Sequence, residues 1–147
     1  IVGNHVIMAN GATLAGHITV DDEAFIGGLS AVHQFVRIGK GSIIGGMSAV
    51  EHDVIPYGNV KEKRAFLSGL NVVGLKRRGA KREDVRVLYD IYKRLFSTHQ
   101  TLAERVESLL KEYNHHLEAK VLLDFVKADS SRSLLMPEDE ERALLNT

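Results

Sequence analysis

Hydrophobic positions recur every six residues over the first third of the chain. This first column holds only aliphatic residues and methionine: Val2, Met8, Leu14, Val20, Ile26, Val32, Ile38, Ile44 and Val50. A second column, four residues further on, holds small or β-branched residues: Val6, Ala12, Ile18, Ala24, Ser30, Val36, Ser42, Ser48 and Val54. The residue directly after each aliphatic is usually glycine, alanine or an acid, which permits a tight corner. Since neither a helix nor a flat sheet has a six-residue period, the repeat predicts a parallel β-helix in which three hexads close one triangular coil.

An antiparallel β domain is the alternative, but its strands would alternate with period two and be separated by turn signals. The sixfold column runs without a slip, which favours the β-helix. Nine hexads make about three coils over residues 1–55. The chain begins at Ile1, already inside the repeat, so we expect the repeat to be truncated at its N-terminus. The end coils of such a stack expose apolar side chains and unpaired strand backbone unless something covers them.

The repeat ends at Pro56 and Gly58, and charged residues follow. Among them are Lys61, Glu62, Lys63 and Arg64. We therefore expect residues 56–80 to form a basic connecting loop.

Helical periodicity replaces the hexads over residues 81–128. Three apolar stripes at spacings of three and four residues predict three helices. The stripes comprise Val85, Leu88, Tyr89, Tyr92, Leu95 and Phe96, then Leu102, Val106, Leu109, Leu110 and Tyr113, then Val121, Leu122, Phe125 and Val126. Thr101 and Glu104 have the spacing of a capping box at the start of the second helix. The tail, residues 129–147, is polar and is expected to be frayed.

Composition excludes several function classes. The formal net charge of zero argues against bulk nucleic-acid binding. The chain has no cysteine, so it has no disulfide framework and no thiolate chemistry. No run approaches the 18 apolar residues of a membrane-spanning helix, and no signal-peptide pattern opens the chain, so we expect a cytoplasmic protein with no integral membrane segment.

Three motifs carry a resemblance to a known family. They are GATLAGHITVDD (Gly11–Asp22), AVHQF (Ala31–Phe35) and GLNVVGLKRRG (Gly69–Gly79). Together they resemble the bacterial UDP-N-acetylglucosamine O-acyltransferases that begin lipid A synthesis. The resemblance implies a left-handed parallel β-helix followed by a small α-helical C-terminal domain, with this chain matching the C-terminal half of a member.

The same resemblance implies an activity and partners. Members transfer a 3-hydroxyacyl group from acyl carrier protein to the 3-hydroxyl of UDP-N-acetylglucosamine. They work as homotrimers whose active sites lie between neighbouring β-helices. The carrier-protein thioester is the donor, and no separate cofactor or metal is implied.

By resemblance, the backbone N–H of Gly16 is the oxyanion donor, and His17 contacts the sugar nucleotide. His33 lies nearer the acyl-donor arm, and Gln34 is a hydrogen-bonding partner of the substrate. The family's general base is a histidine just upstream of the position matching Ile1, so it is not in this chain, and the resemblance gives His5 no catalytic role.

Two further positions carry expected roles. Asn71 and Arg77 are assigned to the nucleotide, and the planar fork of an arginine suits a diphosphate. A small residue at Gly46 is expected to leave the acyl-chain groove open for a longer chain. The chain departs from the family at Glu62 and Lys63, at Val73, where some members have an acid, and at Lys81, where a capping serine is common.

Other functions remain open at this stage. A zinc enzyme on a β-helix would need three converging imidazoles, and His17 and His33, 16 residues apart, supply two. A non-catalytic trimeric module that binds UDP-sugar and acyl carrier protein is also possible, because the expected base lies outside the chain. A related β-helix N-acyltransferase of the same pathway is a nearer competitor, but GLKRRG and three helices fit the O-acyltransferase better.

Overall fold

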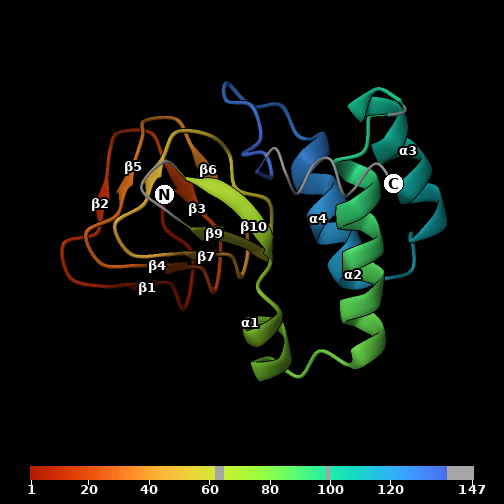
Figure 1. Cartoon of the computed structure of the whole chain (residues 1–147), viewed down its shortest axis with the longest axis horizontal. Helices are drawn as coiled ribbons and strands as arrows, with labels where there is room; N and C mark the ends of the chain where they lie inside the picture. Colours follow the sequence, from red (N-terminus) through yellow and green to blue (C-terminus); the bar gives the residue numbers. More distant parts are fainter. Residues whose placement is uncertain (62–64, 99, 139–147) are drawn as a thin grey trace.

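The computed structural model describes residues 1–61, 65–98 and 100–138. One two-residue strand forms in each hexad from the second to the ninth. They are β1 (Ile7–Met8), β2 (Thr13–Leu14), β3 (Thr19–Val20), β4 (Phe25–Ile26), β5 (Ala31–Val32), β6 (Arg37–Ile38), β7 (Ile43–Ile44) and β8 (Ala49–Val50). They stack in three parallel sheets, β1-β4-β7, β2-β5-β8 and β3-β6. Met8 pairs with Ile26 and Ile26 with Ile44, a step of 18 residues or three hexads. The predicted left-handed parallel β-helix is thus confirmed (Figure 1).

Both predicted columns point into the solenoid. Ile26, Ile38 and Ile44 are fully buried, and each such side chain contributes roughly 1.5–3 kcal/mol. In the second column the hydroxyls of Ser30 and Ser48 both donate to the carbonyl of Gly45, at 2.9 and 2.8 Å, which satisfies them inside the core. The buried Ser42 hydroxyl of the same column has no hydrogen-bond partner among the described residues, and the first rungs around Val2 and Met8 stay exposed.

From residues 4–5 to residues 46–47, the turn of each corner lies two and three residues after the aliphatic, not directly after it as the small residues suggested. The third residue adopts a left-handed conformation, as His17 (φ 58°) and Phe35 (φ 67°) show. The small residue before the turn serves close approach instead, because a Cβ on Gly27 would lie 2.5 Å from the Gly46 nitrogen. We name the corners by their residues: corner A comprises residues 4–5, 22–23 and 40–41, corner B residues 10–11, 28–29 and 46–47, and corner C residues 16–17, 34–35 and 52–53.

The expectation of a loop over 56–80 is wrong. This segment forms β9 (Gly58–Lys61), β10 (Phe66–Leu70) and the short helix α1 (Val72–Arg77). β9 adds in parallel to β7, and β10 pairs antiparallel with β9, so both extend the β1-β4-β7 sheet. The physical reason is burial: Val60 and Leu67 are fully buried among the charged residues and close the C-terminal end of the solenoid. The departures noted at Glu62 and Lys63, like Arg64, lie outside the described residues.

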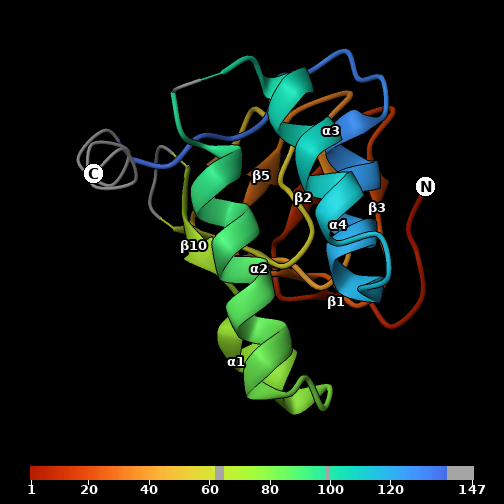
Figure 2. The ribbon, with the colours of Figure 1, turned by 90° about the vertical axis from the view of Figure 1, so that its right-hand side faces the viewer.

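Three helices follow as expected: α2 (Arg82–Leu95), α3 (Leu102–Glu112) and α4 (Leu117–Lys127). They pack against one another beside the solenoid, with α4 nearest to it and α3 farthest from it (Figures 1 and 2). Thr101 and Glu104 form the expected capping box of α3. At α2 the Lys81 side chain makes no capping bond, but the Asp84 carboxylate accepts the Lys81 N–H at 2.7 Å. The guanidinium of Arg37 lies 4.3 Å from the centroid of the Phe125 ring and so joins β6 to α4.

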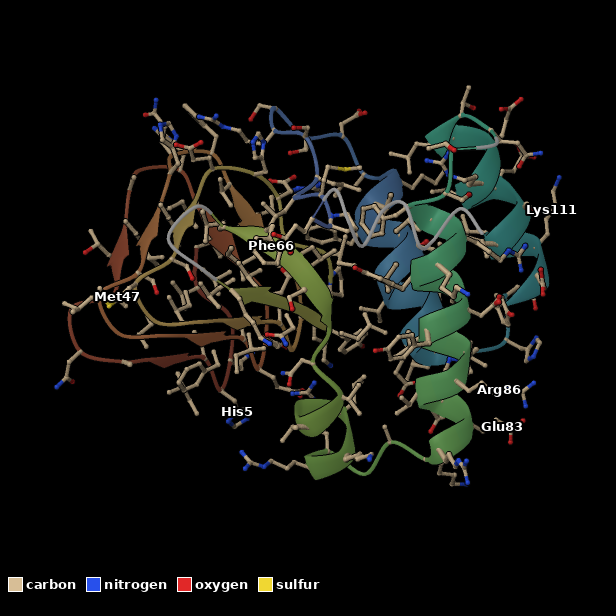
Figure 3. The ribbon with its side chains drawn as sticks, in the orientation of Figure 1. His5, Met47, Phe66, Glu83, Arg86 and Lys111 are labelled. Atoms are coloured by element: carbon tan, nitrogen blue, oxygen red, sulfur yellow. The ribbon has the colours of Figure 1, made fainter. Side chains whose placement is uncertain are left out.

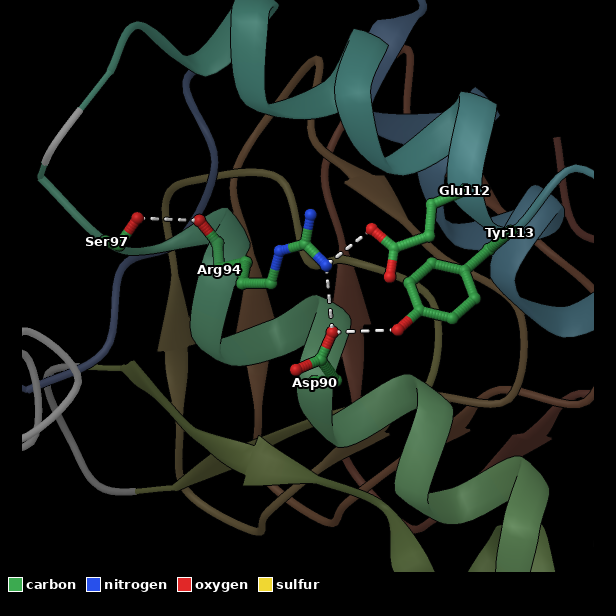
Figure 4. Close-up of polar contacts among 5 residues, drawn as sticks. All are labelled: Asp90, Arg94, Ser97, Glu112 and Tyr113. Carbon is green, nitrogen blue, oxygen red and sulfur yellow. Dashed lines mark hydrogen bonds and ion pairs between the residues drawn. The ribbon is translucent and has the colours of Figure 1, made fainter.

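A polar network fixes α2 against the end of α3 (Figure 4). Arg94 Nη1 contacts Asp90 Oδ2 at 3.2 Å and Glu112 Oε2 at 2.8 Å. The Tyr113 hydroxyl donates to the same Asp90 oxygen at 2.9 Å. Desolvation, followed by the Asp90 carboxylate, raises the pKa of Tyr113 to about 12.

The tail is not frayed over its described part, which is a second correction. Leu134 forms a parallel bridge with Asp53, and Leu135 is buried. Ser130 donates to Asp53 Oδ2 at 2.5 Å, and this carboxylate, itself fully buried, also accepts from Arg37 Nε at 2.7 Å. The tail returns because corner C offers it unpaired backbone and a buried charge that needs donors.

Candidate functional site

Corner C brings four of the expected site residues to one exposed edge. Gly16, His17 and Gln34 occupy its turns, and His33 immediately precedes the turn of the second coil. A Cβ on Gly16 would meet nothing within 4 Å. Across the described ranges, no hydrogen bond engages the Gly16 N–H, while its carbonyl accepts from the Phe35 N–H at 3.2 Å. Gly16 therefore presents a free backbone donor with open space around it, as an oxyanion donor requires.

His17 is held by a stacking partner that sequence reasoning did not single out. Its ring lies 5.0 Å from the ring of Phe35, centroid to centroid, with an interplanar angle of 11°. The two residues are 18 apart, so they stack on successive coils. Both have positive φ, which costs roughly 1–2 kcal/mol for a residue other than glycine. The hexad spacing could have identified Phe35, since it shares the register of His17.

His33 is held from the tail. Its Nδ1 lies 2.7 Å from Arg132 Nη2 and 3.4 Å from the carbonyl oxygen of Gln34. One coil further on, the Ser133 hydroxyl lies 3.0 Å from His52 Nδ1. Sequence reasoning missed Arg132 because no local pattern links residues 99 positions apart.

The expected nucleotide residues lie at a different corner. Asn71 caps α1 by accepting the Gly74 N–H at 2.9 Å, and it donates to the Gly41 carbonyl of corner A at 3.0 Å. Arg77 lies in the last turn of α1 and is exposed. Its neighbour Arg78 pairs with Glu23 of corner A at 3.0 Å. Asn71 thus has a structural role at the junction of α1 and the solenoid, and Arg77 is left as the accessible guanidinium.

A cavity of about 280 Å³ opens beside corner A. Its charged and polar lining includes Glu23, Lys40, Tyr57, Arg78 and Glu118. Burial, with the Glu118 charge second, raises the pKa of Tyr57 to about 12. The raised pKa therefore extends to higher pH the range in which the Tyr57 hydroxyl is neutral and can act as a donor.

Gly46 lies at corner B, the third edge. A Cβ there would sit 3.2 Å from the Gly28 carbonyl oxygen of the coil below. Its neighbour Met47 is 58% exposed and projects from the edge remote from the helices (Figure 3). Leu29, in the same register one coil earlier, is 69% exposed. The Gly46 turn is therefore tight and borders exposed apolar side chains.

The expected site residues therefore occupy three edges of one prism. Corner C carries Gly16, His17, His33 and Gln34, corner A adjoins Asn71 and Arg77, and corner B carries Gly46. One side of the triangle is six residues, up to about 20 Å of extended chain. Within a single chain the three groups thus lie at three different corners.

The geometry gives little support to a zinc site that includes His17 and His33. In the described part of the chain, the group whose ligand atoms lie within 4.8 Å of one another is Asp84, His116 and Glu118, not the pair His17 and His33. Two of these three cap helices, since Asp84 accepts the Lys81 N–H and His116 Nδ1 accepts the Ala119 N–H at 3.3 Å. Both helix N-termini point positive ends at the cluster, which favours its carboxylates and disfavours a cation.

Among the described residues, no helix is both long and apolar enough to cross a membrane.

Comparisons with known proteins agree on one family. The family model for UDP N-acetylglucosamine O-acyltransferase, domain 2, matches residues 53–135. The acyl-[acyl-carrier-protein]–UDP-N-acetylglucosamine O-acyltransferase of Sinorhizobium fredii is 44% identical over 136 residues, which cover 92% of this chain and 50% of that protein. A solved UDP-N-acetylglucosamine acyltransferase is 41% identical, with a TM-score of 0.84 over 92% of this chain and 51% of its own.

The enzyme of Francisella novicida superposes with a TM-score of 0.85 at 29% identity, covering 93% of this chain and 50% of its own. The chain spans about half the length of the curated relatives it matches. The hexad fold, the three motifs and these similarities lead to one conclusion: the chain belongs to the UDP-N-acetylglucosamine O-acyltransferase family.

Proposed function

We propose that this chain supplies the oxyanion donor and the substrate-binding residues for transfer of a 3-hydroxyacyl group from acyl carrier protein to the 3-hydroxyl of UDP-N-acetylglucosamine, in lipid A biosynthesis. The observation that carries the proposal is the arrangement at corner C, where the free N–H of Gly16 lies on the same exposed edge as His17, His33 and Gln34. The compartment that goes with this function is the cytoplasm. The only co-reactant is the carrier-protein thioester, and no metal or other cofactor takes part.

The chemistry needs a base and an oxyanion donor. A base removes the proton of the sugar 3-hydroxyl, and the oxygen attacks the thioester carbonyl carbon. Negative charge develops on the carbonyl oxygen, and the Gly16 N–H donates to it. The intermediate then collapses, the carbon–sulfur bond breaks, the carrier thiol leaves with the proton, and an ester remains. We assign the base to a histidine upstream of Ile1, in accord with the family resemblance.

Two neighbouring copies assemble one complete site in this proposal. Corner C of one copy provides Gly16 and His17, and the α1 region of the next copy provides Asn71 and Arg77 for the nucleotide. The family resemblance implies this sharing, and the placement of the two groups at different corners of one chain is compatible with it. A closed ring of three copies would repeat the same interface three times, as cyclic symmetry requires.

Gly46 sets the length of the acyl chain in this proposal. Corner B carries the exposed apolar side chains of Leu29 and Met47, a surface that suits a hydrocarbon tail. A Cβ at Gly46 would lie 3.2 Å from the Gly28 carbonyl oxygen, so a larger residue would crowd this turn beside the apolar surface. We therefore expect Gly46 to permit a longer acyl group.

Acyl transfer by this chain, beside a version extended upstream through the expected histidine, tests the proposal. We expect turnover of 3-hydroxyacyl carrier protein and UDP-N-acetylglucosamine only in the extended version, and UDP-sugar binding by both. Binding without turnover by either version would identify a non-catalytic module instead. Turnover by the short chain would refute the upstream base and require one among His5, His17 and His33.

A further inference from the structure

The returning tail contacts the site edge through a residue, Arg132, that lies outside the three motifs. Arg132 Nη2 lies 2.7 Å from His33 Nδ1, although 99 residues separate the two along the chain. We propose that Arg132 is a positioning residue, which fixes the tautomer and the orientation of His33 on corner C.

The backbone around Arg132 is anchored independently of His33. The Arg132 N–H donates to the Ser130 hydroxyl at 3.1 Å, and that hydroxyl donates to the buried Asp53 carboxylate at 2.5 Å. The Asp53 N–H donates to the Ser133 carbonyl at 2.9 Å, and the Leu135 N–H donates to the Asp53 carbonyl at 2.6 Å. The guanidinium therefore reaches His33 from a fixed base, not from a free chain end.

Donor chemistry then decides the tautomer. A guanidinium has only donors, so the Nδ1 that it contacts must carry the lone pair, and Nε2 carries the proton. The competing partner of Nδ1 is the Gln34 carbonyl, an acceptor at 3.4 Å, which would require the proton on Nδ1. The contact at 2.7 Å is short for a hydrogen bond and one of its partners is charged, so it outweighs the longer one. Arg132 thus leaves the Nε2–H of His33 as the donor presented to whatever occupies the edge.

The experiment observes the tautomer directly, by 15N–1H long-range NMR of the whole chain with 15N-labelled histidine. A His33→Gln variant identifies the His33 signals. We expect the wild type to show an unprotonated Nδ1 and a protonated Nε2. Arg132→Met, which keeps an unbranched apolar stem and removes every donor, is expected to move the proton population towards Nδ1, and Arg132→Lys is expected to keep the wild-type pattern.

Lys127→Met is the matched control, because Lys127 lines the same cavity between tail and helices as Arg132 and loses one positive charge in the same way. Unchanged His33 signals in Arg132→Met, or the same change in Lys127→Met, would overturn the proposal. So would a wild-type His33 with its proton on Nδ1. Thermal unfolding of each variant shows whether the fold itself has changed.

A kinetic measurement connects this positioning to the proposed function, on which its last step rests. In the upstream-extended chain, Arg132→Met is expected to lower kcat/KM for the acyl carrier donor about tenfold, the low end of what one charge-assisted hydrogen bond contributes, with KM for UDP-N-acetylglucosamine unchanged. Arg132→Lys is expected to keep most of the wild-type kcat/KM for the acyl carrier donor. If the tautomer changes and the kinetics do not, the placement of His33 at the donor arm is wrong, while the Arg132–His33 positioning stands.

Discussion

Replacing Asp53 with asparagine tests how the helical domain and its tail are fastened to the solenoid. The Asp53 carboxylate is fully buried and has three donors: the Arg37 N–H at 2.8 Å, Arg37 Nε at 2.7 Å and the Ser130 hydroxyl at 2.5 Å. Asparagine keeps the shape and one acceptor oxygen. Its NH2 group, however, faces either Arg37 Nε or the Arg37 backbone N–H. In both orientations a donor faces another donor, and one hydrogen bond is lost.

The magnitude follows from the bonds lost. A hydrogen bond to a charged group contributes about 1.5–3 kcal/mol, and a buried pair that loses one partner costs about 3–5 kcal/mol. The Arg37 side chain is 20% exposed and so recovers some hydration, which places the expected loss at about 2–3 kcal/mol. For a chain of this size that lowers Tm by about 4–12 °C.

Urea unfolding at fixed protein concentration measures the change, because oligomer stability depends on concentration. Hydrogen exchange at the Leu135 N–H, which donates to the Asp53 carbonyl, reports whether the tail is released first. Asp129→Asn, an exposed carboxylate of the same tail, is the control and should stay within about 0.5 kcal/mol. A loss below about 0.5 kcal/mol in Asp53→Asn would refute the reasoning.

Three further predictions address the coils and three titrating groups. Gly27→Ala is expected to destabilise the fold by about 1–3 kcal/mol, because its Cβ would lie 2.5 Å from the Gly46 nitrogen. The Cβ of Gly16→Ala meets open space, so this variant should change stability by less than about 0.5 kcal/mol. Chemical denaturation compares the two variants, and equal losses would contradict the account. The pKa values of Tyr57 and Tyr113 are raised to about 12, so folding favours the protonated form of each. The free energy of unfolding should therefore be constant below about pH 10 and fall towards pH 12. Tyr57→Phe should make that fall shallower, and an unchanged slope would exclude Tyr57 as a contributor. Burial, with the Asp22 charge second, raises the pKa of Asp21 above its ordinary 3.8. Asp21→Asn should therefore increase stability at pH 7 and lose that advantage as the pH falls below 3.8. Denaturation of both proteins at the two pH values measures the difference, and a destabilised variant at pH 7 would contradict the argument.

The hexad column predicted the solenoid because its period belongs to no other common element, and each 18-residue step fixes which residues stack. The same step places His17 above Phe35 and Gly16 beside Gln34, so corner C was predictable. The helical stripes from Val85 onwards were predictable for a similar reason, since each repeats over several turns.

What the sequence could not predict depends on contacts between distant residues. β9 and β10 are short and separated by charged residues, and the open edge of the solenoid stabilises them, so local periodicity gave only a loop. The tail looks polar, yet Asp53 and corner C hold it in place. The Arg132 contact with His33 spans 99 residues and needs both of these features first.

Mixed trimers test the central claim, that one site is built from two neighbouring copies. In the upstream-extended chain, His17→Ala removes a residue of corner C and Arg77→Ala removes the α1 guanidinium, so each variant alone should be inactive or nearly so. Unfolding the two together and reassembling them should restore one intact site in each mixed trimer, about a third of wild-type activity for that trimer. No recovery in mixtures whose mixed assembly is verified by mass would show that His17 and Arg77 of one copy serve the same site, and would contradict the account.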